Sequence, residues 1–595
     1  MPRDLAFTLP TLRAAYAGGL RPEAVIAEAF ARLDALADPG IFLHEARASA
    51  LAQARALGAP DGRPLWGIPY AVKDNIDVAD MPTTAACPDF AYEASADAFV
   101  VARLRALGAI CLGKTNLDQF ATGLVGVRTP YPVPRNALDP ALVPGGSSSG
   151  SAVAVARGLV AFGLGTDTAG SGRVPAALND IVGLKPSLGA LSSAGMVPAC
   201  RTLDTISIFA HSVAEAWELF TLTAGFDPED PWSRPLPHPQ LAPLRGTVTV
   251  AVPDGASLRT FGDDAQAAHF RATLERLRAT GATLREIDLA PFYAVAELLY
   301  SGPWVAERAA AVGNRLTEAP ETLHEVTRAI LTPGLALSAV DAFRGLYRLQ
   351  ELRRVCAQAL EGADLLCVPT IPCFVTREEI AADPFGPNSR LGTYTNFVNL
   401  LDLCGIAVPT GPRRDGRPGS LTVLARAGED GRAAALALRI ERGGAPGRVA
   451  ENGSAEDESA EDEIAEDEIA LAVCGAHMAG LPLNGELTGR GGRFLREART
   501  RCDYRLFALP GGPPARPGLL RVAEGEGAAI ALEVWALPRA AVGDFLAGIP
   551  APLVIGTVEL EDGHSVKGFL CEPHGLKDAR DITASGGWRA ALAEE

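Results

Sequence analysis

Short apolar runs alternate with longer amphipathic stretches along most of the chain. The runs WGIPYAVKDNI, GTVTVAVP, ADLLCVPT, GIAVPTG and LTVLA are typical of buried strands, whereas residues 21–57 predict two helices, the first beginning at Pro22 and ending at Gly40. Further helices are expected over 263–280 and 339–361. ADAFVVARLRALGAICLGKTN, with a turn at Gly108, and SAVAVARGLVAFGLGTD each predict a helix followed by a strand. This alternation favours an α/β domain with a mixed or mostly parallel sheet covered by helices.

The alternating pattern stops near Gly443 and gives way to an acidic repeat. The tetrapeptide AEDE occurs three times at five-residue spacing, which is the period of neither a helix nor a strand. The repeat therefore predicts a solvated linker; a helix is the open alternative, although its like charges would repel. Short strand-like runs and Gly/Pro turns then resume. We expect a domain over 1–443, an acidic linker over 444–469 and a second domain over 470–595.

Composition narrows the functional classes. The net charge of −17 argues against nucleic acid or an anionic membrane as the main partner, although the charge is uneven, because 451–470 hold ten acidic and no basic residues. The N-terminus lacks the apolar core of a signal peptide, and no apolar run approaches the length of a membrane span. Ten scattered cysteines without a CxxC pair predict reduced thiols in a cytoplasmic protein.

Three motifs carry candidate chemistry. GIPYAVKDNID places Lys73 at the end of an apolar strand, VPGGSSSGSAVAVA places Ser147 between a glycine pair and a helix, and GLGTDTAGSGRVPA places Ser171 in a strand-to-helix turn. Each motif alone has an ordinary interpretation: a surface lysine, a flexible loop, and a turn built of turn residues. Their combination is what indicates a function.

In this order, with Ser147 and Ser171 separated by 24 positions, the motifs resemble the amidase signature family over roughly residues 20–440. The resemblance implies an amidohydrolase acting on linear amides, with a mixed sheet covered by helices on both faces. It implies that Ser171 is the nucleophile, that Ser147, held by a cis peptide bond, relays the proton, and that Lys73 accepts it. The backbone N–H groups of Thr168, Ala169, Gly170 and Ser171 would hold the oxyanion.

Residue chemistry supports this interpretation independently. Serine attack on an amide needs a base, yet the nearest histidines, His44 and His211, lie outside all three motifs. A lysine serves if burial keeps it neutral, and Lys73 follows an apolar strand. The motif departs from the commoner family wording at Ala169, which keeps its N–H, and at Gly172, which we expect to enlarge or repolarise the pocket beside the nucleophile.

The wording GTDTAGSGRVPA resembles the allophanate hydrolase subgroup of this family. In YSGPWVAERAAAV the resemblance implies that Tyr300 and Arg308 hold the substrate, with the guanidinium on its carboxylate, and it adds Gly123 to the binding residues. If the helix is unbroken at Pro303, both side chains return to nearly the same face. Without the resemblance, the expected role of Arg308 is that of a surface helix residue.

The C-terminal sequence LAVCGAHMAGLPLNGELTGRGGRFL also resembles this subgroup, whose extra domain is similar to the γ-glutamylcyclotransferase-like fold, a small mixed α+β, barrel-like structure. The resemblance links that domain to breakdown of N-carboxycarbamate, and His477 is the candidate residue; a turn histidine bonded to backbone is the alternative. We expect no role for His564 and His574. No metal or cofactor is implied, a homodimer is expected, and urea carboxylation would need a separate protein as a pathway partner.

The sequence leaves two other functions open. A broad-specificity amidase of the same family would depend little on Arg308. An amidotransferase component of a tRNA-dependent complex would need partner subunits, and the C-terminal domain would be unexplained. A non-catalytic scaffold is disfavoured because Lys73, Ser147 and Ser171 are all present.

Overall fold

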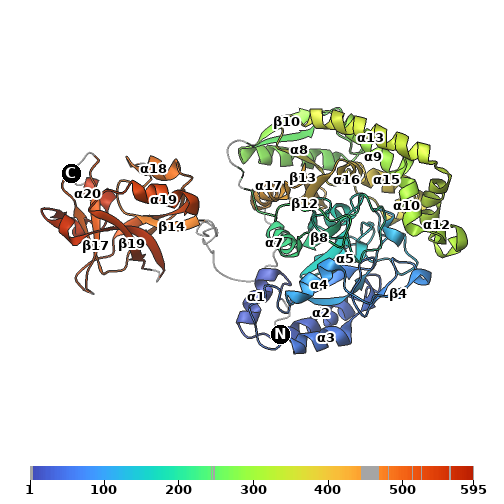
Figure 1. Cartoon of the computed structure of the whole chain (residues 1–595), viewed down its shortest axis with the longest axis horizontal. Coiled ribbons are helices and arrows are strands. Elements are labelled where there is room, and N and C mark those ends of the chain that lie inside the picture. Colours follow the sequence, from blue (N-terminus) through green and yellow to red (C-terminus); the bar gives the residue numbers. More distant parts are fainter. Residues whose placement is uncertain are drawn as a thin grey trace. The chain divides into compact units, whose positions relative to one another are not determined.

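The computed structural model describes residues 5–242, 244, 248–443, 468–479, 481–511, 514–523, 525–561 and 564–593 (Figure 1). It divides into two compact units, Met1–Val449 and Ala450–Glu595. Most of the predicted acidic linker, 444–467, lies outside the described residues. Its last two positions belong to strand β14 (Glu468–Val473) of the second unit.

Within the described part of the first unit, one mixed sheet holds eleven strands in the order β1-β5-β2-β6-β8-β7-β12-β13-β11-β9-β10. Their bounds are β1 Phe42–Glu45, β2 Pro69–Lys73, β5 Ile110–Thr115, β6 Phe162–Thr166, β7 Val182–Lys185, β8 Ile206–Ala210, β9 Thr249–Pro253, β10 Thr283–Ile287, β11 Leu365–Pro369, β12 Leu403–Pro412 and β13 Pro418–Arg426. A short pair, β3 Pro82–Thr83 and β4 Tyr92–Glu93, lies apart. Strand β2 runs parallel to both β5 and β6, so the carboxyl ends of these three strands meet at one edge.

Helices cover both faces of this sheet, as the resemblance implied. Successive side chains of a strand point to opposite faces, and in β11 Leu365 and Cys367 join one apolar core while Leu366 and Val368 join another. The first core includes residues of α8 and α17, and the second includes residues of α9, α13 and α16. Strand β11 is therefore apolar on both faces rather than alternating.

The helices of the first unit are α1 Leu9–Ala17, α2 Pro22–Leu36, α3 Arg47–Ala56, α4 Phe99–Ala106, α5 Ser149–Ala156, α6 Arg173–Leu178, α7 Val213–Thr223, α8 Asp264–Ala279, α9 Ala290–Ser301, α10 Trp304–Val312, α11 Arg315–Glu318, α12 Glu325–Leu331, α13 Ala339–Ala359, α14 Arg377–Ala382, α15 Gly386–Leu391, α16 Asn396–Leu400 and α17 Asp430–Gly443. The helices predicted over 263–280 and 339–361 are confirmed as α8 and α13. The first predicted helix ends earlier than expected, because Ala37 adopts a left-handed conformation that terminates α2. Strand β1 then separates it from α3.

The second unit contains a five-stranded mixed sheet, β15-β18-β14-β20-β19, and a three-stranded sheet, β17-β16-β21, within its described residues. The strands are β14, β15 Arg493–Arg499, β16 Tyr504–Ala508, β17 Pro517–Arg521, β18 Ala531–Pro538, β19 Leu553–Glu559, β20 Ser565–Cys571 and β21 Arg580–Asp581, with helices α18 Asn484–Thr488, α19 Arg539–Ala547 and α20 Trp588–Ala593. Its core is separate from those of the first unit. Across the described chain, no single helix is long and apolar enough to cross a membrane; the pair Glu325–Ala336 and Ala339–Ala359 reaches that length and composition only across a 102° bend.

Candidate active site

Lys73 ends strand β2, which lies between β5 and β6 in the large sheet, and is completely buried. Its Nζ donates to Ser147 Oγ at 2.7 Å and to Thr166 Oγ1, at the end of β6, at 2.6 Å. Burial lowers the pKa of Lys73 from its ordinary value to about 7, although the carboxylates of Asp118, Asp204 and Asp167 oppose this effect. An amine with that pKa exists in both protonation states near neutral pH, as a proton acceptor in catalysis requires.

Ser147 and Gly123 are organised around a buried carboxylate. The Gly146–Ser147 peptide bond is cis, as the resemblance implied. The backbone N–H of Asp118 donates to the Ser147 carbonyl at 3.1 Å, and the Asp118 carboxylate accepts from the N–H groups of Gly126 and Arg128 at 2.9 Å. A Cβ on Gly123 would lie 2.5 Å from Asp118 Oδ2. Gly123 thus belongs to the loop that Asp118 ties to Ser147.

Ser171 lies between strand β6 and helix α6, in a turn built on an internal ion pair. Asp167 and Arg173 are fully buried and form two hydrogen bonds of 2.9 Å. Although burial favours a neutral carboxyl, the charge and hydrogen bonds of Arg173 hold the pKa of Asp167 below its ordinary value. The pair fixes the backbone on either side of Ser171, because Asp167 also accepts from the N–H groups of Gly170 and Gly172.

These contacts revise the predicted oxyanion donors. The Gly170 N–H is directed at Asp167 Oδ1, 2.9 Å away, and is therefore already bonded. Gly170 has φ +122°, in the left-handed region, and the side chain of Thr395 occupies the space of its missing Cβ. Within the described chain, the N–H groups of Thr168, Ala169 and Ser171 have no protein acceptor. Likewise, no hydrogen bond joins the hydroxyls of Ser147 and Ser171 among the described residues.

Gly172 does not enlarge a pocket, contrary to the expectation from sequence. A Cβ at this position would lie 2.6 Å from Cβ and 2.7 Å from Oγ of Ser207, on strand β8. Contacts that short do not occur without a shift of the backbone or of Ser207. The glycine therefore lets the turn that carries Ser171 pack directly against the sheet.

Tyr300 and Arg308 come together although the helix between them is broken. Helix α9 ends at Ser301 and α10 begins at Trp304, so the unbroken helix that the sequence suggested does not form. The Arg308 guanidinium nevertheless lies over the Tyr300 ring, 4.9 Å from its centre. Arg308 is buried, and none of its three guanidinium nitrogens has a hydrogen-bond partner among the described residues. A buried guanidinium without a protein partner is the arrangement expected for a site that binds an anion.

A chain of hydrogen bonds connects the turn that carries Ser171 to the helix that carries Arg308. Thr168 Oγ1 donates to Asp204 Oδ1 at 2.5 Å, and the other oxygen of Asp204 accepts from the N–H of Cys200 at 3.0 Å. Two residues after Cys200, Thr202 donates its N–H and its hydroxyl to Glu307 at 2.8 and 2.7 Å. Burial raises the pKa of Asp204 to about 6, opposed by the hydrogen bond from Thr168. Glu307 thereby fixes α10, and so Arg308, relative to the Ser171 turn.

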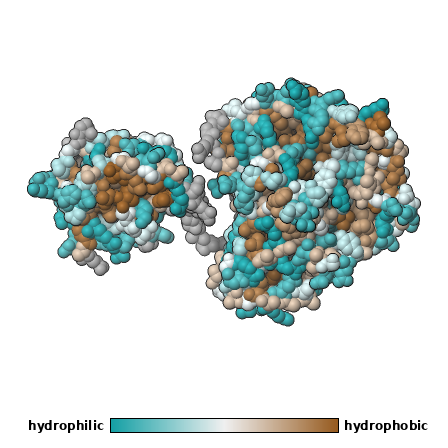
Figure 2. All heavy atoms as spheres, viewed as in Figure 1, coloured by the Kyte–Doolittle hydropathy of each residue, from teal (hydrophilic) through white to brown (hydrophobic). Residues whose placement is uncertain are grey.

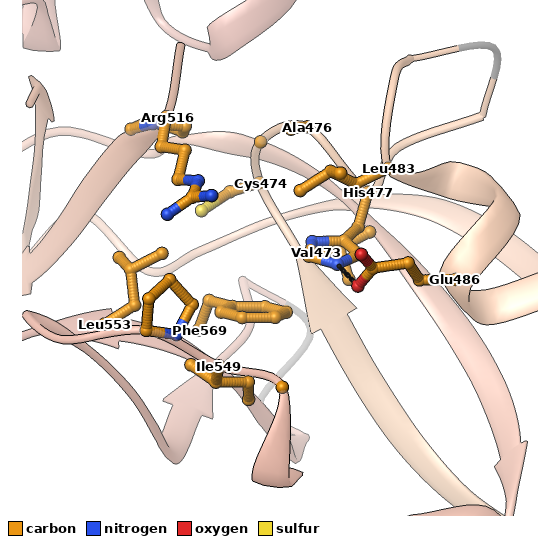
Figure 3. Close-up of a pocket in the computed structure, with 14 residues that line it drawn as sticks. Val473, Cys474, Ala476, His477, Leu483, Glu486, Arg516, Ile549, Leu553 and Phe569 are labelled. Carbon is orange, nitrogen blue, oxygen red and sulfur yellow. Dashed lines mark hydrogen bonds and ion pairs between the residues drawn. The ribbon is translucent and has the colours of Figure 1, made fainter. Parts of the chain in front are cut away.

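The second unit holds a separate small cavity of about 70 Å³, drawn in Figure 3. His477 lies in the turn after strand β14, where its ring stacks on Phe569 with centres 5.0 Å apart, and its Nε2 lies 3.2 Å from Glu486 Oε2. Burial lowers the pKa of His477, although Glu486 opposes this. The side chain of Arg516 points into the same cavity, and its Nε has no partner in the described chain. His574, in contrast, is exposed.

With this geometry in place, comparison with known proteins identifies the family. A family model described as amidase matches residues 24–433, which is more than half of the chain. The chain belongs to the amidase family. A second model, described as the allophanate hydrolase C-terminal domain, matches residues 469–593 of this amidase.

Urea amidolyase of Saccharomyces cerevisiae is 45% identical over 542 residues, which is 89% of this chain but 29% of that protein. The chain thus spans less than a third of the length of this relative. Urea amidolyase of Lachancea kluyveri is 44% identical over 541 residues, which is 88% of this chain and 30% of that protein. The structure of allophanate hydrolase from Kluyveromyces lactis matches with a TM-score of 0.74 at 39% identity and covers 99% of this chain and 100% of that chain.

Sequence reasoning missed several residues of this candidate site. Asp167 and Arg173 stand inside the quoted motif, and their opposite charges six positions apart, flanking Ser171, were an available signal. Thr166, which accepts a hydrogen bond from Lys73, ends strand β6 just before this motif's Asp167. Asp204 and Glu307 had no such signal, because their partners lie far away in the sequence.

Proposed function

We propose that this chain hydrolyses allophanate, the N-carboxylated form of urea, to ammonia and carbon dioxide. The observation that carries the proposal is the buried guanidinium of Arg308, unpaired among the described residues and stacked on Tyr300. Allophanate combines a terminal amide with a carboxylate, and a guanidinium fork matches a carboxylate at two points. The match to the allophanate hydrolase C-terminal domain supports the same substrate.

In the first step, Ser171 Oγ attacks the terminal amide carbon. As the O–C bond forms, the Ser171 proton passes to Ser147 Oγ, whose own proton passes to neutral Lys73. When the C–N bond breaks, Lys73 returns a proton through Ser147 to the departing ammonia, and an acyl group remains on Ser171. The N–H groups of Thr168, Ala169 and Ser171 hold the oxyanion, and we assign Gly170 to shaping the turn. Binding of substrate must bring the two serine hydroxyls into hydrogen-bond contact.

Water then attacks the acyl group by the same relay and releases N-carboxycarbamate. This dicarboxylate loses carbon dioxide to give carbamate, which decomposes to ammonia and a second carbon dioxide. We propose that the cavity of the second unit accelerates this loss, with His477 as its proton-transfer group. The contact with Glu486 supports the role, because a carboxylate on one ring nitrogen sets the tautomer of the other. Arg516, which points into the cavity, is available to neutralise a carboxylate.

The resemblance further leads us to propose a homodimer. The cytoplasm is the expected compartment, because all ten cysteines are free thiols. Since urea amidolyases are among the relatives, a urea-carboxylating enzyme that supplies allophanate is the proposed pathway partner.

The test compares ammonia and carbon dioxide released from allophanate, biuret and acetamide. We expect turnover of allophanate to exceed that of acetamide, and Ser171→Ala and Ser147→Ala to lower ammonia release by roughly four orders of magnitude. Ser149→Ala is the matched control, because the Ser149 hydroxyl donates to the Asn116 carbonyl and not to the relay. Equal turnover of acetamide would refute the substrate, and full activity of Ser147→Ala would refute the relay.

A further inference from the structure

Helix α16 (Asn396–Leu400) carries a buried asparagine, Asn399, that the proposed reaction does not use. Asn399 is completely buried, beneath the mixed hydrophilic and apolar surface of the first unit that Figure 2 shows. Its helix packs on α9, the helix that carries Tyr300, and the rings of Phe397 and Phe292 meet edge to face there with centres 5.4 Å apart. A buried amide in such surroundings needs partners for two N–H donors and a carbonyl acceptor.

The amide of Asn399 bridges two segments that are far apart in the sequence. Its Nδ2 donates to the Asp167 carbonyl at 2.7 Å and to the Leu203 carbonyl at 2.8 Å, which uses both of its hydrogens. Its Oδ1 accepts from the guanidinium of Arg173 at 3.5 Å. A reversed amide would set an oxygen against two carbonyls, so this orientation alone satisfies all three contacts. Asn399 is therefore a fixed double donor.

Both carbonyls that Asn399 binds lie next to the hydrogen bond between Thr168 and Asp204. The Asp167 carbonyl belongs to the peptide group that precedes Thr168, and the Leu203 carbonyl belongs to the one that precedes Asp204. Thr168 Oγ1 in turn donates to Asp204 Oδ1. Thr168 is thus held by its side chain and by the peptide group before it.

The bond to the Asp167 carbonyl sets the direction of the Thr168 N–H. The peptide between these two residues is trans, and in a planar trans peptide the C=O and N–H bonds point in opposite directions. A carbonyl that points at Asn399 therefore directs the Thr168 N–H away from α16. Thr168 is only 2% exposed, yet its N–H has no protein acceptor in the described chain. Buried N–H groups are almost always paired, so this one is available to a ligand.

We propose that Asn399 is a positioning residue of the oxyanion hole, which aims and polarises the Thr168 N–H through the Asp167 carbonyl. A hydrogen bond to the carbonyl strengthens the N–H of the same peptide as a donor. The inference rests on the proposed reaction and adds a residue that acts through the backbone of the turn that carries Ser171. Because the charge on the substrate oxygen develops in the transition state, loss of Asn399 should lower kcat rather than raise KM.

The test compares two variants that lose the same kind of group. Asn399→Ala removes a buried amide bonded to two carbonyls, and so does Asn136→Ala, because Asn136 Nδ2 donates to the carbonyls of Val143 and Leu178 at 3.0 and 2.9 Å. Asn136 is completely buried as well, but neither of its acceptors lies in the turn that carries Ser171. Urea titration of the full chain measures the stability that each variant loses, and Asn136→Ala is the control for structural damage.

Steady-state ammonia release is measured with whichever of allophanate, biuret and acetamide the wild type turns over fastest. For Asn399→Ala we expect kcat to fall about 10- to 100-fold, with KM within about twofold of the wild type. Its pH–rate midpoint should stay near pH 7, because Asn399 makes no hydrogen bond to Lys73 or Ser147 within the described chain. Asn136→Ala should keep kcat within about twofold of the wild type. An equal fall of kcat in both variants, or a loss of Asn399→Ala activity that lies in KM, would overturn the proposal.

Two further variants complete the design. Asn399→Ser supplies a hydroxyl to its own helix backbone, but its side chain is one atom shorter than asparagine and loses the bond to Asp167. It should show the same fall in kcat at unchanged KM, and wild-type kcat in this folded variant would overturn the role of Asn399. Ser171→Ala is measured alongside. Retained activity in Ser171→Ala would refute the proposed reaction itself, whereas an inactive Ser171→Ala with wild-type kcat in both Asn399 variants would refute only this inference.

Discussion

The pH dependence of ammonia release tests the central role of Lys73 most directly. The proposed relay needs the neutral amine, so the rate should rise with pH as Lys73 loses its proton and level off above its pKa. With a pKa of about 7 in place of 10.5, about half of the enzyme carries a neutral Lys73 at pH 7. An ordinary lysine would be neutral in only about 0.03% of molecules at that pH. Burial of the amine therefore increases the competent fraction by about three orders of magnitude.

The assay is the initial rate of ammonia release at subsaturating allophanate, which gives kcat/KM of the first step. We expect about a tenth of the plateau rate at pH 6, half at pH 7 and a plateau from about pH 8. Asp204, whose pKa is about 6, titrates nearby and needs a control. Asp204→Asn removes a negative charge that raises the pKa of Lys73. The pH–rate profile of that variant should therefore still show a single ionisation, with its midpoint at lower pH than in the wild type. A rate that still climbs tenfold per unit between pH 8 and pH 10 would refute the buried neutral amine.

Four further predictions concern other parts of the molecule. Arg308→Ala should raise KM for allophanate by about 10- to 100-fold through loss of a charge-assisted contact and leave acetamide turnover unchanged, as steady-state kinetics on both substrates would reveal. Glu307→Gln weakens the hydrogen bonds that fix α10, so KM for allophanate should rise several-fold without a fall in Tm. An equal loss of activity on acetamide would contradict a positioning role for Glu307. Gly172→Ala should destabilise the fold by about 1–3 kcal/mol in a urea titration, with partial recovery when Ser207→Gly is added; full stability of the single variant would contradict the close packing. His477→Ala should leave ammonia release from the first step intact but slow carbon dioxide release. If the variant released both products with the same time courses as the wild type, His477 would have no role in the second step.

Local patterns in the sequence predicted what depends on local structure. Lys73 at a strand end, and Ser147 and Ser171 in the turns before helices, follow from apolar runs interrupted by small and polar residues, and each is found there. The strands β9, β11, β12 and β13 lie within the predicted runs or extend them by a few residues. Strand β1 was missed, because a four-residue run between two helices carries too little periodicity to separate it from them.

What escaped prediction depends on contacts between distant segments. The space beside Gly172 is filled by Ser207, and no property of the sequence near Gly172 reveals this neighbour. In the same way, Tyr300 and Arg308 meet across a break at Pro303, so their proximity comes from the packing of two helices rather than from the period of one. The bond from Thr168 to Asp204 spans 36 positions, and that from Thr202 to Glu307 spans 105.

The proposed site therefore holds two buried basic side chains with different tasks. Lys73 must lose its charge to accept a proton, whereas Arg308 must keep its charge to bind a carboxylate. Burial brings the pKa of Lys73 to about 7, because an ammonium depends strongly on water for its stability. Burial is also the largest single effect on Arg308, yet Tyr300, Cys200 and Asp204 together outweigh it, and the pKa of Arg308 stays above its ordinary value. A guanidinium thus remains charged where an amine does not. An arginine at position 73 could not accept a proton, and a lysine at position 308 would lose its charge in the buried site. Arg308→Lys should therefore bind allophanate more weakly as pH rises, whereas the affinity of the wild type should not fall in this way.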